Sequence, residues 1–300
     1  MDQPPKPLRL AVIGFGRLGR ACGETILGNE ALRLAGFVRR NDTMHKPLPN
    51  NFRGIATTSN IATLGAIDAA LLCVPAAMTG DAAYELLQHR IPIVECAAQA
   101  ADDFESQRER LHHVALRHRV AAIWGAGWDP GALSLLRRLF TLLIPKGHTE
   151  TTDRPGISLH HTLTTTAIDG VRDALCTEVH SVEGKAQRYV YVELAPGAEA
   201  ERVTTLIRSD PGFLDAETLV FPVESVAALE QQGHGTVLAR RGNAGAAVHQ
   251  MLLFEARFDV AALAAQVMVA TARALRWMPP GFHALSELPL NFLCPEEIRI

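Results

Sequence analysis

The feature that most constrains the fold of this chain is a glycine-spaced turn that follows its first apolar segment. Arg9–Ile13 is predicted to be a buried strand, the glycines at 14, 16 and 19 follow it, and a second apolar segment covers Leu32–Val38. In such turns the first glycine permits a tight bend, the second allows a pyrophosphate to approach, and the third lets the next helix pack closely. The pattern predicts a dinucleotide-binding βαβ unit with the phosphates at the helix N-terminus. The expected cofactor contacts here are Gly14, Phe15, Gly16, Arg17, Leu18 and Gly19.

Two arginines, Arg39 and Arg40, stand at the end of the second predicted strand. Proteins that bind NAD usually have an acid about 20 residues after the glycines, where it accepts hydrogen bonds from the ribose 2′-hydroxyl. Guanidinium groups instead donate to a phosphate dianion, so the pair favours NADP as the cofactor. The alternative is a solvated surface pair without a ligand.

Composition excludes several other classes of function. The chain has 300 residues, 48% of them hydrophobic and 20% charged, and its net charge of −3 disfavours nucleic acid or an anionic membrane as a partner. No segment has the length or the apolar character expected of a signal peptide or a spanning helix. The five cysteines are scattered, and the twelve histidines lack ligand spacing. We therefore expect a reduced, cytoplasmic chain without disulfides or a metal site.

Strands and helices are expected to alternate through the first 125 or so residues, which predicts a parallel sheet. After Pro130 the pattern becomes that of an α+β region, with strands at 158–164, 178–181, 187–194, 219–223, 235–241 and 250–258, and a helix at 261–275. The predicted fold is α/β, a Rossmann-type doubly wound parallel sheet with a second α+β domain. We assign 1–127 plus 262–300 to the dinucleotide-binding domain and 128–261 to a substrate-binding and dimerisation domain.

Ligands of doubly wound sheets bind beyond the carboxyl ends of the strands. The segments that follow the predicted strands at 69–74 and 92–95 should therefore contact the cofactor. The residues expected to do so are Cys73, Val74, Pro75, Glu95 and Ala97.

The loop at 125–131 follows another strand and carries Trp128, Asp129 and Pro130 between glycines. Trp128 offers a flat apolar wall, and the carboxylate of Asp129 could meet a substrate amine. The alternative is that Asp129 only caps a helix that begins near Pro130.

With these motifs the chain resembles the meso-diaminopimelate dehydrogenase family, nearly from end to end. The matching segments are 11–20, 38–40, 71–75, 126–131, 170–175, 191–194, 233–235 and 264–270. The resemblance implies NADP-dependent oxidative deamination of a D-configured amino acid centre to a 2-keto acid and ammonia. It implies that Trp128 and Asp129 are catalytic, that Arg188 grips a substrate carboxylate, and that His234 lies near the distal end of the substrate. For His234 a turn-forming role is the alternative. A homodimer formed through the second domain is also implied.

The chain departs from the family pattern in the substrate-binding half. Ala98 stands where the family has a second aspartate, Glu178 where it has a threonine, and His249 where it has an asparagine, while Arg154 replaces an aromatic residue. Losing one of two acceptors for the substrate ammonium would cost on the order of 1–3 kcal/mol. The substrate is then either another amino acid or imine, or diaminopimelate held by compensating contacts. The expected substrate-binding residues are Gly127, Arg154, Ser158, Glu178, Arg188, His234 and His249.

Two other functions remain open from the sequence. One is an NADPH-dependent imine or keto-acid reductase of the same fold, for which His160, His161 and Glu178 could form an enlarged polar pocket. The other is a non-catalytic sensor of NADP(H), against which Asp129 and Arg188 argue. For both the dehydrogenase and the reductase, the expected partner is a small amino-acid or keto-acid substrate.

Overall fold

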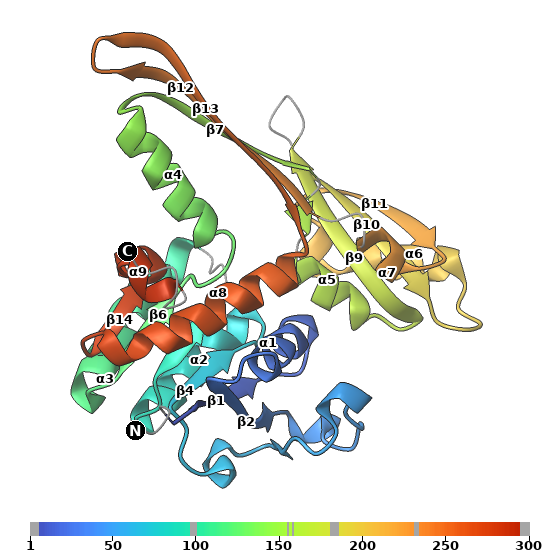
Figure 1. Ribbon diagram of the computed structural model, residues 1–300. Helices are drawn as coiled ribbons and strands as arrows, with labels where there is room; N and C mark the ends of the chain where they lie inside the picture. Colours follow the sequence, from blue (N-terminus) through green and yellow to red (C-terminus); the bar gives the residue numbers. More distant parts are fainter. Residues whose placement is uncertain are drawn as a thin grey trace. The chain divides into compact units, whose positions relative to one another are not determined.

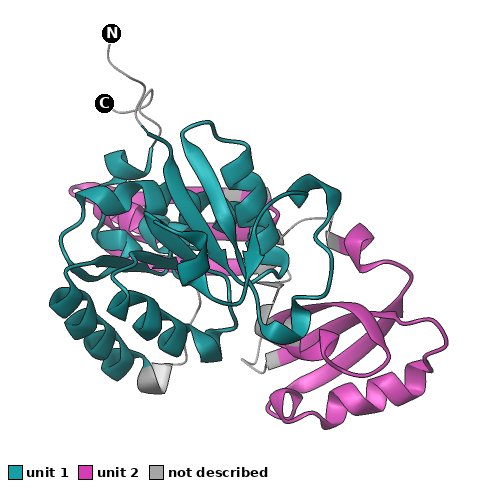
Figure 2. Cartoon of the chain, turned by 90° about the horizontal axis from the view of Figure 1, so that it is seen from below, with its two compact units in different colours: residues 1–136, 261–300 teal, residues 137–260 magenta. Residues whose placement is uncertain are grey.

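The computed structural model describes residues 6–96, 101–154, 156–157, 159–180, 186–230 and 234–294. The chain divides into two compact units (Figure 2). Unit 1 comprises Met1–Leu136 and Ala261–Ile300, and unit 2 comprises Arg137–Val260. We describe each unit by itself.

Unit 1 is built on a seven-stranded sheet in the order β14-β6-β5-β4-β1-β2-β3 (Figure 1). Each pair of neighbouring strands is parallel. The strand order reverses between β1 and β4, which is the point where doubly wound sheets bind their ligands. The predicted Rossmann-type fold is therefore confirmed. The strands are β1 Leu8–Ile13, β2 Leu32–Val38, β3 Thr57–Thr58, β4 Ala69–Leu72, β5 Ile93–Glu95, β6 Ala121–Trp124 and β14 Gly281–Ala284.

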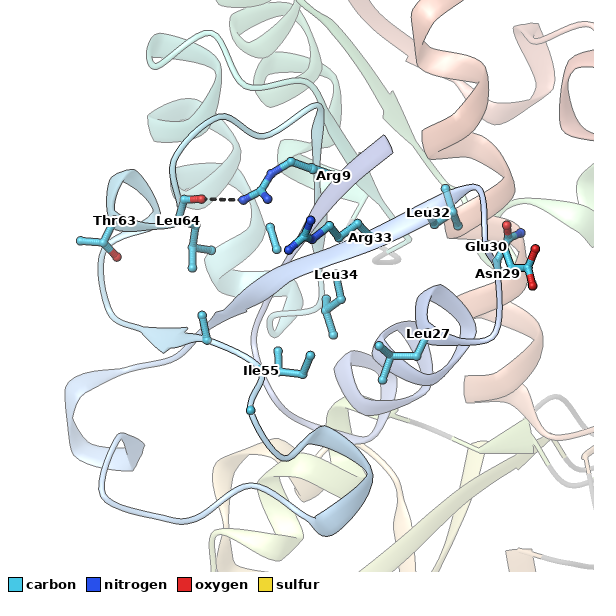
Figure 3. Close-up of a pocket in the computed structure, with 13 residues that line it drawn as sticks. Arg9, Leu27, Asn29, Glu30, Leu32, Arg33, Leu34, Ile55, Thr63 and Leu64 are labelled. Carbon is cyan, nitrogen blue, oxygen red and sulfur yellow. Dashed lines mark hydrogen bonds between the residues drawn. The ribbon is translucent and has the colours of Figure 1, made fainter. Parts of the chain in front are cut away.

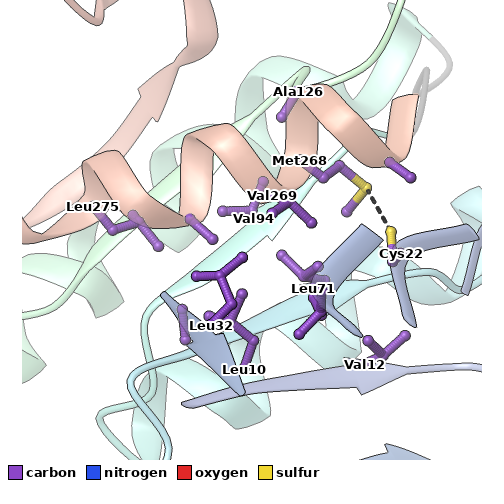
Figure 4. Close-up of a cluster of buried hydrophobic side chains, with 14 of the residues drawn as sticks. Leu10, Val12, Cys22, Leu32, Leu71, Val94, Ala126, Met268, Val269 and Leu275 are labelled. Carbon is purple, nitrogen blue, oxygen red and sulfur yellow. Dashed lines mark hydrogen bonds between the residues drawn. The ribbon is translucent and has the colours of Figure 1, made fainter. Parts of the chain in front are cut away.

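Helices cover both faces of this sheet. Successive side chains of a strand point to opposite faces, so each strand contributes side chains to a core on either side. Leu10 and Val12 of β1 pack with residues of α1 and α8 in one core cluster (Figure 4). Ala11, between them, belongs to the second cluster, with residues of α2 and α3. Burying each such leucine stabilises the fold by roughly 1.5–3 kcal/mol. The helices are α1 Arg17–Leu27, α2 Ala76–Gln88, α3 Ala101–His118, α8 Val260–Ala274 and α9 Leu290–Leu293, with short 3-10 turns at 41–43, 50–52, 61–64, 275–277 and 285–287.

Unit 2 contains two further sheets. One has four strands in the order β11-β10-β9-β8, and the other has three in the order β13-β12-β7. In the four-stranded sheet β10 pairs antiparallel with β9 and parallel with β11. The elements are α4 Ala132–Leu143 (which crosses the unit boundary), β7 Lys146–Arg154, β8 Gly156–Ile157, α5 Leu159–Thr166, β9 Val171–His180, β10 Ala186–Leu194, α6 Ala200–Ser209, η4 Pro211–Phe213, β11 Glu217–Val223, α7 Val226–Glu230, β12 His234–Ala244 and β13 Ala247–Phe258.

Two expectations for unit 2 need correction, and one strand was not expected. The segment 158–164 is predicted to be a strand, but α5 begins at Leu159 and runs through it. β9 begins at Val171, seven residues before the strand expected from Glu178. The unexpected strand is β7, which forms an edge of the three-stranded sheet and is almost entirely polar. Its nine residues pair along β12, so backbone hydrogen bonds and not an apolar pattern hold it in place.

Candidate active site

The glycine turn lies at the carboxyl ends of β1 and β4, where the strand order reverses. Gly14 has a φ of +102°, and a Cβ placed on it would lie 2.3 Å from the carbonyl oxygen of Cys73. The Gly14 N–H donates to the Val38 carbonyl at 2.8 Å, and the Cys73 N–H donates to the Ile13 carbonyl at 2.8 Å. Only glycine combines this φ with so close an approach of two backbones. The turn therefore brings two backbone segments into close contact at Gly14.

The other two glycines of the turn differ in the space around them. A Cβ on Gly19 would lie 2.3 Å from the carbonyl oxygen of Gly14, so Gly19 permits the packing of α1 against the turn. A Cβ on Gly16 would meet no atom within 4 Å. Gly16 is the N-cap residue of α1, no side chain caps that end, and the first turn contains no acidic residue. Open space beside a helix N-terminus of this kind suits a phosphate group.

Arg39 has a structural role that its position in the sequence does not reveal. Its side chain is buried, with two nitrogens donating to the carbonyls of Lys46 at 2.9 Å and Thr43 at 2.6 Å. Its guanidinium also lies 5.1 Å from the centre of the Phe15 ring. Arg39 therefore ties the segment after β2 to the glycine turn.

Arg40 is placed differently from its neighbour. Its side chain is 70% exposed, and its NH2 lies 3.4 Å from Asp42 Oδ2. An exposed ion pair of this kind contributes little to stability and is readily exchanged for another anion. Of the two arginines, Arg40 is thus the one that is accessible to a 2′-phosphate.

Three cysteine thiols gather at the carboxyl edge of the sheet. Cys73 follows β4, its Sγ lies 3.7 Å from Cys22 Sγ on α1, and Cys22 in turn lies 4.0 Å from Met268 Sδ. The contact with Cys22 and burial raise the pKa of Cys73, and burial raises the pKa of Cys96. Both shifts favour the protonated thiol. A Cβ placed on Gly14 would lie 3.6 Å from Val74 Cγ1, and Pro75 is the N-cap residue of α2.

The loop at 125–131 lies at the same edge of the sheet. The N–H of Ala126 donates to the carbonyl of Glu95, the fully buried last residue of β5. A Cβ on Gly127 would lie 3.1 Å from Cys96 Cβ, so the loops after β5 and β6 touch. These contacts continue the edge from the glycine turn to the loop of Asp129. All of these residues belong to unit 1.

Within this loop the side chain of Asp129 is exposed, Trp128 is half-buried, and the Asp129–Pro130 peptide bond is cis. The chain folds back so that Gly127 and Gly131 form a bridge. The N–H groups of Ala132 and Leu133 donate to the carbonyls of Gly127 and Trp128 at 3.0 and 2.9 Å. Backbone carbonyls thus satisfy these two donors at the start of α4, which weakens the view that Asp129 is there only to cap the helix.

Arg188 lies in unit 2 on β10, and two carboxylates of the chain itself hold it. Its NH1 and NH2 donate to the two carboxylate oxygens of Asp215, the latter at 2.9 Å, and its Nε lies 3.3 Å from Glu178 Oε2. NH1 also donates to the Gly212 carbonyl at 3.2 Å. The hydrogen bonds from Arg188 lower the pKa of Asp215 to about 2, so this carboxylate is charged at neutral pH. Asp215 is not among the site residues expected from the sequence.

The structure does not bring His249 to this cluster. Arg188 and Glu178 pair across β10 and β9, whereas His249 lies near the turn of the β12–β13 hairpin, exposed and with a φ of +58°. Its N–H lies 3.4 Å from Asn243 Oδ1. Ala97, Ala98 and Ser158 lie outside the described residues, and for Arg154 and His234 only the backbone is described, in β7 and at the start of β12.

Two hollows of unit 1 lie away from the glycine turn. One, of about 620 Å³, is lined by Arg9 and Arg33 at the amino ends of β1 and β2 (Figure 3), the opposite edge from Gly14. The other, of about 720 Å³, lies among residues of α1, α4, α8 and α9. Neither contains a residue of the expected cofactor site.

The described part of the chain contains no group of three or more histidine, cysteine or acidic side chains arranged to hold a metal ion. None of its helices is both long and apolar enough to cross a membrane.

The chain is similar to proteins named meso-diaminopimelate D-dehydrogenase. The protein of that name from Bacteroides fragilis is 37% identical over 290 residues, which cover 97% of this chain and 96% of the relative. One from Ureibacillus thermosphaericus is 24% identical over 320 residues and 96% of each chain. No protein-family model matches the chain.

Solved structures show the same fold. An engineered D-amino acid dehydrogenase bound to NADP+ superimposes with a TM-score of 0.76 at 20% identity over 98% of both chains. A C. glutamicum DAP dehydrogenase in complex with DAP gives a TM-score of 0.74 at 22% identity over 97% of both chains.

Proposed function

The chain belongs to the meso-diaminopimelate D-dehydrogenase family, and we propose that it is an NADP-dependent dehydrogenase of the D-configured centre of an amino acid. One observation carries the proposal: the glycine turn and the exposed carboxylate of Asp129 stand at the same carboxyl edge of one parallel sheet. In such sheets the cofactor and the reacting part of the substrate meet at this edge.

The residues of the turn fit an NADP cofactor. Open space at Gly16, beside the uncapped end of α1, leaves room for the pyrophosphate, and the exposed Arg40 is positioned for a 2′-phosphate. In this assignment Gly14 and Gly19 shape the turn. The backbone around the phosphates comes from Phe15, Arg17 and Leu18. Arg39 holds in place the segment that carries Arg40. Val74, Pro75, Glu95 and Cys73 border the site from the neighbouring strand ends.

NADP+ supplies a hydride acceptor for the α-carbon of the substrate, and the imine that results is hydrolysed to a 2-keto acid and ammonia. The chain's own task is to orient the amine and to remove its proton. Asp129 accepts hydrogen bonds from the amine and takes the proton that it loses as the C–N double bond forms. Trp128 forms an apolar wall beside Asp129, which limits access of water to the reacting carbon.

A panel of amino acids tests this proposal. We expect NADPH formation with NADP+ and at least one D-amino acid or meso-diaminopimelate, and none with the matching L-amino acids. Tight NADPH binding with no turnover in either direction would instead support the sensor function. Turnover only with a keto acid plus an amino acid would support the reductase.

We further propose that 128–261 binds the substrate and mediates a homodimer, while 1–127 and 262–300 bind the dinucleotide. Side chains alternate along a strand, so Met251 and Leu253 of β13 lie on one face of the three-stranded sheet, and both are at least half exposed. On α4, Leu142 is 75% exposed. Exposed apolar side chains that share one face of a sheet, as Met251 and Leu253 do, are typical of a protein interface.

We expect the Met251→Asp/Leu253→Asp double variant to shift the mass in solution from dimer to monomer, because two charges would be buried in the interface. Light scattering coupled to gel filtration measures that mass. Leu116→Asp, on the exposed side of α3, is the control and should leave the dimer intact. A monomeric wild-type protein would contradict the proposal.

We also infer a cytoplasmic location. The Sγ atoms of Cys22 and Cys73 lie 3.7 Å apart as thiols, and a reducing compartment preserves such a pair. Recovery of the protein from the secreted fraction of cells would contradict this inference.

A further inference from the structure

Two arginines stand at neighbouring positions near the amino ends of the first two strands of unit 1. Arg9 of β1 and Arg33 of β2 are partners in the parallel register, and side chains at such positions share one face of the sheet. Both line the same hollow, where Figure 3 shows their side chains. Like charges at paired positions repel each other, so this pair costs stability unless an anion joins the two cations.

Within the described ranges no carboxylate pairs with either guanidinium. Nε and NH2 of Arg9 donate to the carbonyls of Ala66 and Leu64, both at 2.9 Å, which holds the side chain in place and leaves its charge unneutralised. The carboxylate of Asp68 accepts from the backbone N–H of Arg9, at 2.7 Å. Arg33 is exposed, and its guanidinium has no hydrogen-bond or ion-pair partner among the described residues. Arg9 is thus a fixed cation and Arg33 an available one.

The hollow beside the two arginines has the size and the lining of a small-molecule site. Its volume is about 620 Å³, within the roughly 300–1,000 Å³ that ligand pockets occupy. It borders the first half of β2, whereas β3 pairs further along that strand, with Phe37 and Val38. Its charged lining residues are Arg9, Arg33 and Glu30, which sum to +1. Apolar side chains supply much of the remaining wall, namely Leu27, Leu32, Leu34, Ile55 and Leu64.

We propose that this hollow binds a small organic anion. Its carboxylate or phosphate group accepts hydrogen bonds from the guanidinium groups of Arg9 and Arg33, and its apolar body packs against the leucine and isoleucine side chains of the wall. Guanidinium groups bind both kinds of oxyanion through paired donors, and the bound anion removes the repulsion between the two cations. The site lies at the opposite edge of the sheet from Gly14, so it is separate from the proposed dehydrogenase site and does not depend on it.

Phenyl phosphate and benzoate are suitable probes, because each joins an anionic group to an apolar ring. Benzyl alcohol is their neutral counterpart. Each is titrated by calorimetry into protein that is saturated with NADPH, so that the glycine turn and Arg40 are already occupied. We expect at least one of the two anions to bind with one molecule per chain, and benzyl alcohol not to bind. The tighter of the two anions shows whether the site selects a phosphate or a carboxylate.

Arg33→Gln removes one of the two cations. We expect the Kd of the bound anion to rise about 10- to 100-fold, the range for a charge-assisted hydrogen bond. Without the anion, Tm should stay the same or rise, because the repulsion with Arg9 is lost. A side chain that only supported the fold would lower Tm instead. Arg33→Lys keeps the charge and should bind the anion more tightly than Arg33→Gln.

Arg117→Gln is the matched control, because Arg117 is an exposed arginine of the same unit, in the last turn of α3, and does not line the hollow. It should leave the Kd of the anion unchanged. The proposal is overturned if neither anion binds to the NADPH-loaded protein, or if Arg33→Gln binds the anion as tightly as the wild-type protein does. Either result would leave the proposed dehydrogenase function intact, since that function is measured by turnover at the other edge of the sheet.

Discussion

Asp129→Asn is expected to lower kcat by about 10²- to 10⁴-fold, the range for loss of a positioned acid or base. An asparagine keeps the size of the side chain but cannot take the proton of the substrate amine. The cofactor site lies on other loops of the same sheet edge, so we expect the Kd for NADPH to stay within a factor of about two. Steady-state kinetics and a fluorescence titration with NADPH give the two values.

The control for this variant is Asp81→Asn, which removes an exposed carboxylate from α2. It should leave kcat unchanged. If Asp129→Asn retained wild-type turnover and only lowered Tm, Asp129 would be no more than a residue at the start of α4. The hydrogen bonds of Ala132 and Leu133 to backbone carbonyls argue against that outcome.

Arg40→Asp is expected to raise KM for NADP+ by about 10- to 100-fold, because a charge-assisted bond to the 2′-phosphate is lost and a repulsion is introduced. KM for NAD+ should stay the same or fall, because an acid at this position can accept hydrogen bonds from the ribose 2′-hydroxyl. The measurement is kcat/KM with each cofactor. Equal weakening of both cofactors would contradict our account of cofactor choice.

Arg33→Asp provides the matched control, since Arg33 lies at the opposite end of β2 and lines a separate hollow. Arg39→Asp should behave unlike Arg40→Asp. It breaks the hydrogen bonds to Thr43 and Lys46 and places a carboxylate in a buried position, so we expect a lower Tm in addition to weaker binding of NADP+.

The sequence predicts the dinucleotide-binding half of the molecule well because its physical signals are local. Buried parallel strands are continuous apolar segments, as in Ala69–Leu72, and the glycines at 14 and 19 stand where two backbones must come within contact. The expected cofactor residues that the structure describes, and the loop of Asp129, lie at the carboxyl edge of the sheet, where the βαβ pattern predicts the ligand site.

The second unit is less predictable because its signals conflict. Thr-rich α5 resembles a strand by residue type, since β-branched residues favour strands. Its buried threonines at 162 and 165 instead follow a helical spacing, and their hydroxyl groups are satisfied by the Cys176 N–H and the His161 carbonyl. The tertiary hydrogen bond from the Cys176 N–H to the Thr162 hydroxyl favours the helix against this intrinsic preference.

Asp215 could not be found by any motif. It lies 27 residues after Arg188 in the sequence, and the two meet only because β11 pairs in parallel with β10 and the segment with η4 leads into β11. The resemblance implies that Arg188 binds a substrate carboxylate, and it carries no information about the acids of this chain that pair with Arg188. The partners of Arg188 depend on how the strands of unit 2 pair, which no local motif encodes.

The most direct test of the central claim follows the hydrogen at the α-carbon. The protein is incubated with NADP+ and a panel of substrates, namely D-amino acids and meso-diaminopimelate. Each substrate carries deuterium at its D-configured α-carbon. Mass spectrometry then shows whether the NADPH contains deuterium. Our account predicts that the deuterium of at least one substrate appears in NADPH together with the matching 2-keto acid. It is contradicted if NADPH binds tightly and yet the deuterium of every substrate stays in the amino acid.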